Sequence, residues 1–180
     1  TDEQVIDYCH EVIGLPALFT IDTIFGHIPD SHAIDALEVS ELIQLANITR
    51  DIEKDLMRGV AYHPKLRQHL GTDGTGPAAT DVAFAKHSLM RLATRRAPAF
   101  RRLINESHLS AVSTTRGGAV MMMLFTDRHY RACAASLGLP SWSGPKTVPT
   151  MMLTSLGAGL NRSWADRILE RIEANLVSAG

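Results

Sequence analysis

The sequence predicts an all-α protein, with residues 1–180 in one helical domain, and three observations support this. Apolar residues recur at spacings of three and four along most of the chain, which is the period of an amphipathic helix. The alternation of apolar and polar residues that is typical of strands is hard to find. Aromatic residues make up only 6% of the chain, so side chains that favour strands are scarce.

The composition is that of an ordinary soluble globular chain, with 45% hydrophobic and 21% charged residues. A net charge of −1 argues against a dedicated nucleic-acid-binding protein. Cys9 and Cys133 are far apart and form no CxxC, so neither a disulfide framework nor a zinc site is indicated. The longest apolar run, Val120–Phe125, is much shorter than the roughly 20 residues that span a bilayer. We expect a soluble intracellular protein, and leave its compartment open, including an organelle or a membrane surface.

The first helix is expected to begin near Thr1, because Thr1 and Gln4 have the spacing of a capping box. It should break or kink at Gly14 and Pro16, since glycine weakens a helix and proline lacks the N–H group that a helix interior requires. No internal repeat is visible along the chain.

The second helix is expected to be long. Asp30 or Ser31 can cap its beginning, and it should end near Arg58 with Gly59 as the residue that follows the cap. The remaining chain predicts further helices separated by segments rich in turn residues. A linker at Gly71–Pro77 is followed by a helix that Thr80 or Asp81 caps and that continues past Ala93 to an end or kink at Pro98. The next helix covers Leu109–Leu137 and is interrupted at Gly117 and Gly118. An irregular stretch over residues 140–162 then precedes a last helix, which Ser163 caps.

The second helix carries a polar stripe. At about 100° per residue, Gln44, Asn47, Asp51 and Asp55 fall within a sector about 80° wide, beside an apolar stripe. Two carboxylates one turn apart, with an amide one turn before them, are hard oxygen ligands at a spacing that suits Mg²⁺. The alternative is a solvated helix face on which the carboxylates pair with neighbouring cations. The candidate cations are Arg50, Lys54 and Arg58.

This stripe resembles a motif of the squalene and phytoene synthases, which join two prenyl diphosphates head to head. Their second aspartate-rich helix reads approximately Q-L-x-N-I-x-R-D-x-x-x-D, followed by G-R-x-Y-x-P. The matching residues are Gln44, Leu45, Asn47, Ile48, Arg50, Asp51, Asp55, Gly59, Tyr62 and Pro64. Upstream, Tyr8–Gly14 is similar to the Y-C-Y-x-V-A-G segment of the family, and Ile24-Phe25-Gly26 to a segment that often follows it. The resemblance is good over residues 1–70 and weak beyond them.

The resemblance implies an isoprenoid-synthase-type helical bundle with a central cavity. It implies Mg²⁺ as cofactor and farnesyl or geranylgeranyl diphosphate as substrate. One substrate molecule would ionise, and a second would capture the resulting cation. Whether NADPH is also a cofactor is left open. The implied metal ligands are Asn47, Asp51 and Asp55, and the implied catalytic residues are Asp51, Asp55, Tyr8 and Tyr62. The implied substrate-binding residues are Gln44, Asn47, Arg50 and Tyr130 at the diphosphate, and Ile13, Leu18, Phe19 and Ile43 at the apolar wall.

The chain also departs from the family pattern. Lys54 stands where an acidic residue is usual, His10 replaces a tyrosine, and Pro16 falls in a small-residue segment. The first aspartate-rich helix of the family should precede Tyr8, and no segment of this chain substitutes for it. We therefore expect a bundle without its N-terminal helices, which needs an N-terminal half or a partner chain to complete the site. The alternative function is an inactive family member that serves as a structural or assembly subunit of a larger complex.

A third hypothesis concerns a group of arginines between the third and fourth expected helices. Guanidinium groups suit contacts to an RNA backbone, although a solvated face is the simpler interpretation and nucleic acid is not the expected partner. The arginines are Arg91, Arg95, Arg96, Arg101 and Arg102.

Overall fold

The computed structural model describes residues 1–25, 29–70, 77–107, 109–140 and 142–179, apart from the side chains of Ile24 and Phe25. Within them the chain is all-helical, with 81% helix and no strand, which confirms the predicted fold class. The helices are α1 (Asp2–Cys9), the π-helical turn η1 (His10–Gly14), α2 (Leu15–Phe25), α3 (Asp30–Met57), α4 (Pro64–Arg67), α5 (Ala79–Thr94), α6 (Ala97–Glu106), α7 (Thr114–Ser136), α8 (Val148–Leu160) and α9 (Arg162–Ala179).

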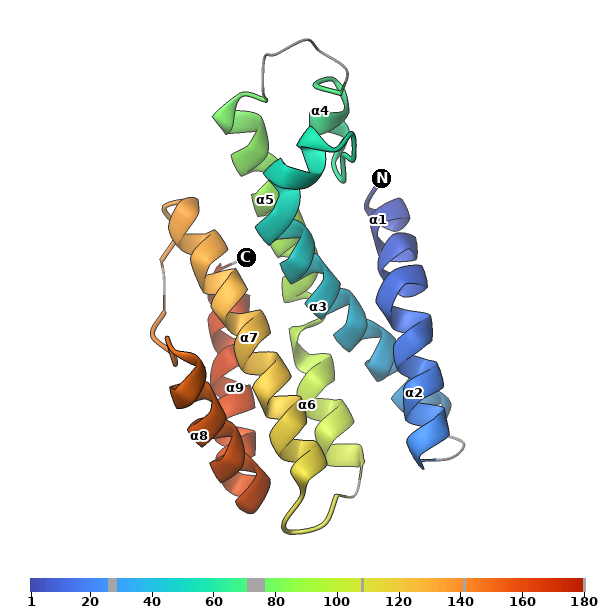
Figure 1. Cartoon of the computed structure of the whole chain (residues 1–180), viewed down its shortest axis with the longest axis vertical. Coiled ribbons are helices and arrows are strands. Elements are labelled where there is room, and N and C mark those ends of the chain that lie inside the picture. The colour runs from blue at the N-terminus through green and yellow to red at the C-terminus, as the bar shows by residue number, and fades with distance from the viewer. Residues whose placement is uncertain (26–28, 71–76, 108, 141, 180) are drawn as a thin grey trace.

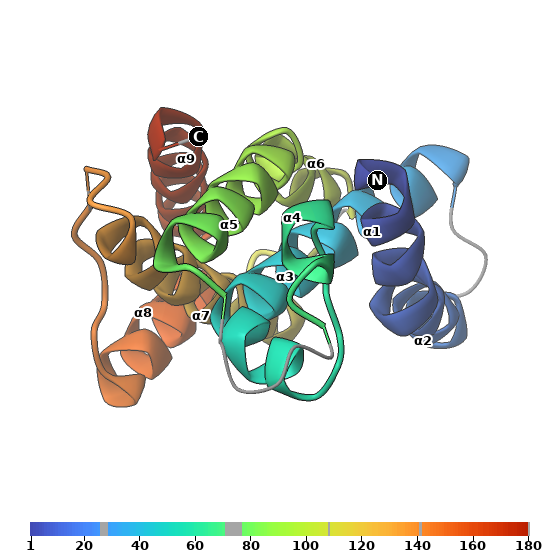
Figure 2. The same cartoon turned by 90° about the horizontal axis from the view of Figure 1, so that it is seen from above.

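Helix α3 runs through the middle of the molecule and packs against α5, α6, α7 and the α1–η1–α2 segment (Figure 1). From above, α3 lies between α1 and α2 on one side and α7 and α8 on the other, while α5 and α6 lie together on a third side (Figure 2). The core residues of α3 include Leu42, Leu45 and Ile52, each at most 1% exposed. Burial of such residues is the main stabilising contribution to a bundle.

The helix predicted to break or kink at Gly14 and Pro16 does not end there, because α1, η1 and α2 form one continuous helical segment. Its α-helical pattern is nevertheless interrupted by the π-helical turn at His10–Gly14. The turn at His10–Gly14 is widened so that the N–H of Leu15 donates to the carbonyl of His10, five residues earlier. A π-turn of this kind accommodates Pro16, which has no N–H to donate within the helix. Gly14 packs closely on α3, since a Cβ there would lie 2.9 Å from Cδ2 of Leu37, the end of a flexible side chain.

The limits of α3 agree in part with expectation. It begins at Asp30 after Pro29, and no side chain caps it, so the predicted cap at Asp30 or Ser31 is wrong. It ends as predicted near Arg58, followed by Gly59 with φ +84°, a value that L-residues rarely adopt. The Gly71–Pro77 linker lies at residues 71–76 outside the described residues, as does Gly26 of the Ile24-Phe25-Gly26 segment.

Three expectations about the C-terminal half are wrong. Helix α5 begins at Ala79, before the predicted caps, and the stretch expected to be irregular contains α8 and the first residue of α9. Gly117 and Gly118 do not interrupt α7, because Gly117 packs against Gly159 of α8. A Cβ at Gly117 would lie 3.1 Å from the carbonyl oxygen of Ser155. These glycines allow two helices to approach closely and do not end them.

Arg116 lies beside this contact and is 1% exposed. Its guanidinium donates only to backbone carbonyl groups, at distances between 2.6 and 2.9 Å. Two of the carbonyls belong to the last turn of α8, where they have no partner within the helix. Arg116 therefore joins the end of α8 to the segment that precedes α7. The four carbonyls are those of Ser110, Ala111, Ala158 and Gly159.

The arginine group of the third hypothesis is largely engaged within the chain. Arg96 pairs with the buried Glu41 of α3, and Glu41 also contacts Nε2 of His10 at 2.5 Å. Two further arginines of the group join α6 to α3 and α9 through carboxylates at 2.7 to 2.9 Å. Ion pairs that connect helices favour a structural role over an RNA contact. These pairs are Arg101 with Glu173, and Arg102 with Asp35 and Glu38.

Both cysteine thiols are expected to resist modification in the folded protein. Cys9 is 0% exposed and Cys133 is 6% exposed. Burial raises the pKa of the Cys9 thiol to about 12, with Glu41 adding to the effect, and burial raises the pKa of Cys133 to about 11. Since only the thiolate reacts, labelling with a chromogenic disulfide at neutral pH should be at least about a hundredfold slower in the native protein than in guanidinium chloride. Similar rates in the two states would contradict the burial.

Candidate functional site

The predicted polar stripe lies on the C-terminal half of α3, between α1 and α7. Gln44, at its buried end, is 8% exposed, and its Oε1 accepts a hydrogen bond from Nδ2 of Asn47 at 3.3 Å. One turn further, Asp51 is 32% exposed at its side chain. Because i, i+3 and i+4 residues of a helix share one face, these three side chains form a continuous row. The stripe is therefore half-buried and open to solvent toward its end.

Asp51 forms an ion pair with Arg50, with Nη2 of Arg50 at 2.5 Å from its Oδ2. The hydrogen bond from Arg50 lowers the pKa of Asp51, so the carboxylate is ionised at neutral pH. Arg50 also lies close to α7, where its Nη1 is 3.3 Å from Nε2 of His129. Burial, and then the positive charges of Arg50 and Arg128, lower the pKa of His129. The imidazole is accordingly neutral at pH 7 and its Nε2 can accept from the guanidinium.

Asp55 belongs to a second polar group at the end of α3. The hydroxyl of Tyr62 donates to its Oδ2 at 3.3 Å, and Arg58 lies 3.7 Å from its Oδ1. Tyr8 of α1 packs against Tyr62 with a distance of 5.5 Å between ring centroids. Burial, with Tyr8 as the next cause, raises the pKa of Tyr62, so this phenol is a hydrogen-bond donor throughout the physiological range. The structure thus brings together Tyr8, Asp55 and Tyr62 as the resemblance implies.

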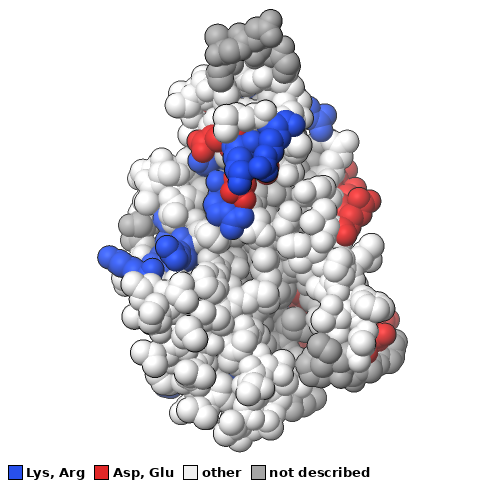
Figure 3. Space-filling model, viewed as in Figure 1, with Lys and Arg blue, Asp and Glu red and all other residues white. Residues whose placement is uncertain are grey.

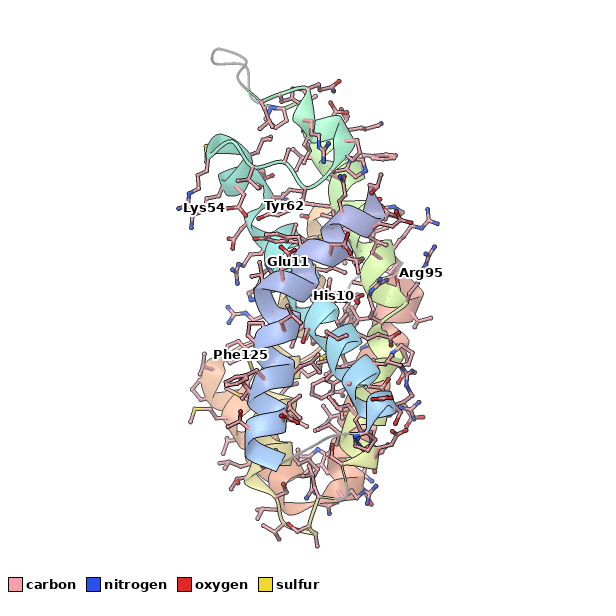
Figure 4. The ribbon with its side chains drawn as sticks, turned by 90° about the vertical axis from the view of Figure 1, so that its right-hand side faces the viewer. His10, Glu11, Lys54, Tyr62, Arg95 and Phe125 are labelled. Carbon is pink, nitrogen blue, oxygen red and sulfur yellow. The ribbon has the colours of Figure 1, made fainter. Side chains whose placement is uncertain are left out.

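The charged residues of this region gather on one part of the surface. Figure 3 shows basic and acidic side chains together over the C-terminal half of α3, above a hollow in a largely uncharged face. Lys54 extends away from α3 at the edge of the molecule, whereas Tyr62 lies toward α1 (Figure 4). Lys54 is therefore directed away from the tyrosine pair.

An apolar cavity of about 490 Å³ lies beside the N-terminal half of α3. Helices α2, α3, α6 and α7 and the η1 turn enclose it, and the predicted wall residues Ile13 and Ile43 both line it. Asn47 follows Ile43 by one turn on the same face of α3, although neither Asn47 nor any other residue of the stripe lines the cavity. Two other predicted wall residues are not part of the lining, since Leu18 does not border the cavity and Phe19 is 74% exposed.

Tyr130 does not join the other candidate residues. It is 0% exposed, and its hydroxyl donates to the carbonyl of Leu42 at 2.6 Å. Burial raises its pKa well above the ordinary value. The hydrogen bond fixes α7 against α3, so in this structure Tyr130 has a packing role and its hydroxyl is not directed toward the stripe.

Two polar contacts of the site have no motif in the sequence. His129 contacts Arg50, 79 positions earlier in the chain, and Nε2 of His32 lies 3.2 Å from Oε2 of Glu106 in the lining of the cavity. Each partner is on a different helix, and no local spacing indicates such a contact. The only available signal for His129 is its position directly before Tyr130 in the helix that packs on α3.

In the structure the two carboxylates of the stripe pair with Arg50 and Arg58, which agrees with the alternative prediction of a charged helix face. Asn47, Asp51 and Asp55 provide hard oxygen atoms on one helix face, and Arg50 keeps Asp51 ionised. Within the part of the chain that the structure describes, no group of three or more His, Cys, Asp or Glu residues is arranged to hold a metal. Two carboxylates suit Mg²⁺ when phosphate oxygens complete its coordination.

Comparisons with known proteins identify no similar protein. No family model, no curated protein and no solved structure matches the chain. Among the described residues, none of the helices has both the length and the apolar character required to cross a membrane.

Proposed function

We propose that this protein binds prenyl diphosphates and belongs to the squalene and phytoene synthase type, with an isoprenoid-synthase-type bundle and Mg²⁺-assisted release of diphosphate. One observation carries the proposal. The cavity wall on α3 ends at Ile43, and Asn47 and Asp51 follow Ile43 by one and two turns on the same helix face. A ligand that extends beyond the cavity along α3 can therefore place an apolar tail beside Ile43 and an anionic head beside the polar stripe. Ligand pockets of this kind are mostly apolar with a few polar groups at defined positions.

The charges at the stripe favour an anionic head group. Arg50, Lys54 and Arg58 provide three positive charges near the two carboxylates. Arg50 donates to Asp51 in the free protein, and its guanidinium can pair with a diphosphate oxygen when one is bound. Mg²⁺ would be held by Asn47, Asp51 and Asp55 and would stabilise negative charge on the departing diphosphate. The apolar wall at Ile13 and Ile43 would keep water away from the tail.

Calorimetry with a non-hydrolysable prenyl thiodiphosphate tests the proposal. Titration of the full chain with farnesyl thiodiphosphate should give one binding event that is at least tenfold tighter with magnesium chloride than with EDTA. Inorganic diphosphate and farnesol should each bind more weakly, because each provides only half of the contacts. Absence of binding with and without magnesium would contradict the proposal.

The second candidate function is a structural or assembly subunit without catalysis, and the surface of α8 favours it. Between Lys146 and Arg162 the chain has no charged residue, and α8 presents a continuous exposed apolar face there. A continuous exposed apolar face of this kind is typical of a surface that contacts another protein. Its members and exposed fractions are Val148 at 43%, Met152 at 53%, Leu153 at 68%, Leu156 at 63% and Leu160 at 67%, with Trp164 of α9 at 42%.

The two functions give different results in the same titration. A subunit that retains only the helical shell should bind neither farnesyl thiodiphosphate nor magnesium. Substituting Leu153 and Leu156 by serine should then disrupt its association with other subunits, while the fold is unchanged because both side chains are exposed. If the chain binds the thiodiphosphate, the same double substitution should leave the affinity within about twofold, since α8 does not border the cavity.

A further inference from the structure

We propose that the exposed face of α8 docks on the surface of an anionic lipid membrane, with the helix lying in the plane of the interface. The inference goes beyond the proposed function, because it concerns a surface that borders neither the cavity nor the polar stripe of α3. Three features of this part of the chain support it: the positions of the exposed apolar residues, a tryptophan at their edge, and the surrounding charges.

The exposed apolar residues of α8 form one stripe along the helix. At about 100° per residue, Met152, Leu153, Leu156 and Leu160 fall within a sector about 100° wide, called here the α8 stripe. Each is at least 53% exposed, whereas Met151 and the other buried residues of α8 are on the side that packs against α7 and α9. The helix thus has one side against its own protein and a second, apolar side toward solvent.

A tryptophan lies at the edge of the α8 stripe. Gly157 borders the stripe, and a Cβ there would lie 2.2 Å from Cζ3 of Trp164, so the indole covers this glycine while it is 42% exposed. Val112, which is 60% exposed, extends the apolar surface at the end of α8, where the N–H of Ser113 donates to the carbonyl of Gly159 at 2.9 Å. Tryptophan is enriched where a membrane meets water, because its ring is apolar and its N–H can reach polar groups.

The charges around the α8 stripe are positive. Between Asp127 and Asp166 the sequence has four basic residues and no acidic residue, although the whole chain has a net charge of −1. Two of the four, Lys146 and Arg162, flank α8, which carries no charge itself. Figure 3 shows a largely uncharged surface over α8, with a basic group above it at the left edge of the molecule. Anionic headgroups attract such cations, and an apolar helix face enters the acyl boundary beneath them. The other two basic residues are Arg128, which is exposed, and Arg131, which pairs with Asp127.

These charges favour a lipid surface over a second copy of this chain. In a two-fold dimer through the α8 stripe, parallel helices would bring each Lys146 toward its counterpart, and antiparallel helices would bring Lys146 toward Arg162. Like charges repel in both arrangements, and the segment between Asp127 and Asp166 has no carboxylate to offset them. An anionic lipid surface satisfies the cations at both ends of α8 at once.

Vesicle flotation with the full chain tests the proposal. Vesicles of phosphatidylcholine with phosphatidylglycerol should bind the protein at least tenfold more tightly than vesicles of phosphatidylcholine alone, and high salt should remove most of this difference. Equal binding to both kinds of vesicle would overturn the proposal. Binding to neither kind, which is the result expected if another subunit covers α8, would also overturn it. The vesicles contain no prenyl diphosphate, so either failure leaves the proposed function in place.

Substitutions locate the contact on α8. Leu153→Ser with Leu156→Ser should weaken binding to the anionic vesicles at least tenfold, and Lys146→Glu should weaken it at least threefold. Val12→Ser with Leu15→Ser is the matched control, because both side chains are exposed and apolar and no lysine or arginine is near them in the sequence. The control should bind within twofold of the unchanged protein. Circular dichroism should show the same helix content for every variant, since all the substituted side chains are exposed. A control that weakens binding as much as the α8 pair would contradict the inference, as would a dimer that the α8 pair dissociates in sedimentation experiments.

Discussion

Replacing Arg116 by methionine is expected to lower the free energy of unfolding by about 1 to 3 kcal/mol, which is the cost of leaving buried acceptor groups without their donor. The guanidinium is 1% exposed and donates to four carbonyl groups. Hydrogen bonds from a charged donor each contribute more than neutral ones. Methionine fills a similar volume but removes the side-chain donor from all four carbonyls, of which that of Gly159 still accepts from the N–H of Ser113 at 2.9 Å. Urea unfolding, followed by circular dichroism, measures the change.

Arg128→Met is the matched control for this substitution. Arg128 lies on the same helix, and its side chain is exposed. Its replacement should change the free energy of unfolding by no more than about 0.5 kcal/mol, as is usual for surface sites. A loss below about 1 kcal/mol for Arg116→Met would show that water or relaxed backbone can satisfy the end of α8 without the arginine.

Asp51→Ala is expected to abolish the magnesium-dependent part of the activity. On the proposed function, release of diphosphate from farnesyl or geranylgeranyl diphosphate by the full chain, or by the complete assembly that contains it, should fall at least about a hundredfold, which corresponds to about 2.7 kcal/mol of lost transition-state stabilisation. The physical reason is the loss of an ionised oxygen ligand whose pKa is lowered by Arg50. Colorimetric detection of released diphosphate provides the measurement.

The same substitution separates a metal ligand from a structural residue. Removal of Asp51 frees the guanidinium of Arg50, which is paired with it in the structure. Binding of farnesyl thiodiphosphate in EDTA should therefore stay the same or become tighter, while binding in magnesium becomes weaker. Asp22→Ala is the control, since Asp22 is exposed on α2, and it should change neither value. Retained turnover in Asp51→Ala would contradict the mechanism.

The local patterns of the sequence predict helices well where one face is buried. The apolar spacing of α3 and the glycine at position 59 define that helix to within a few residues, and its polar stripe is half-buried as expected. Glycine and proline were misleading elsewhere. Gly14 and Gly117 lie in helices because each allows close contact with another helix, and this cannot be recognised without knowing the partner.

The sequence by itself determined the all-helical class and the row from Gln44 to Asp55, because helical period and local spacing are properties of neighbouring residues. Only the tertiary structure decided what faces that row. The contact of Arg50 with His129, that of His32 with Glu106, and the hydrogen bond of Tyr130 to the backbone of α3 each join residues more than 70 positions apart. Such contacts arise from the way helices pack, and the spacing of residues along one helix does not specify them.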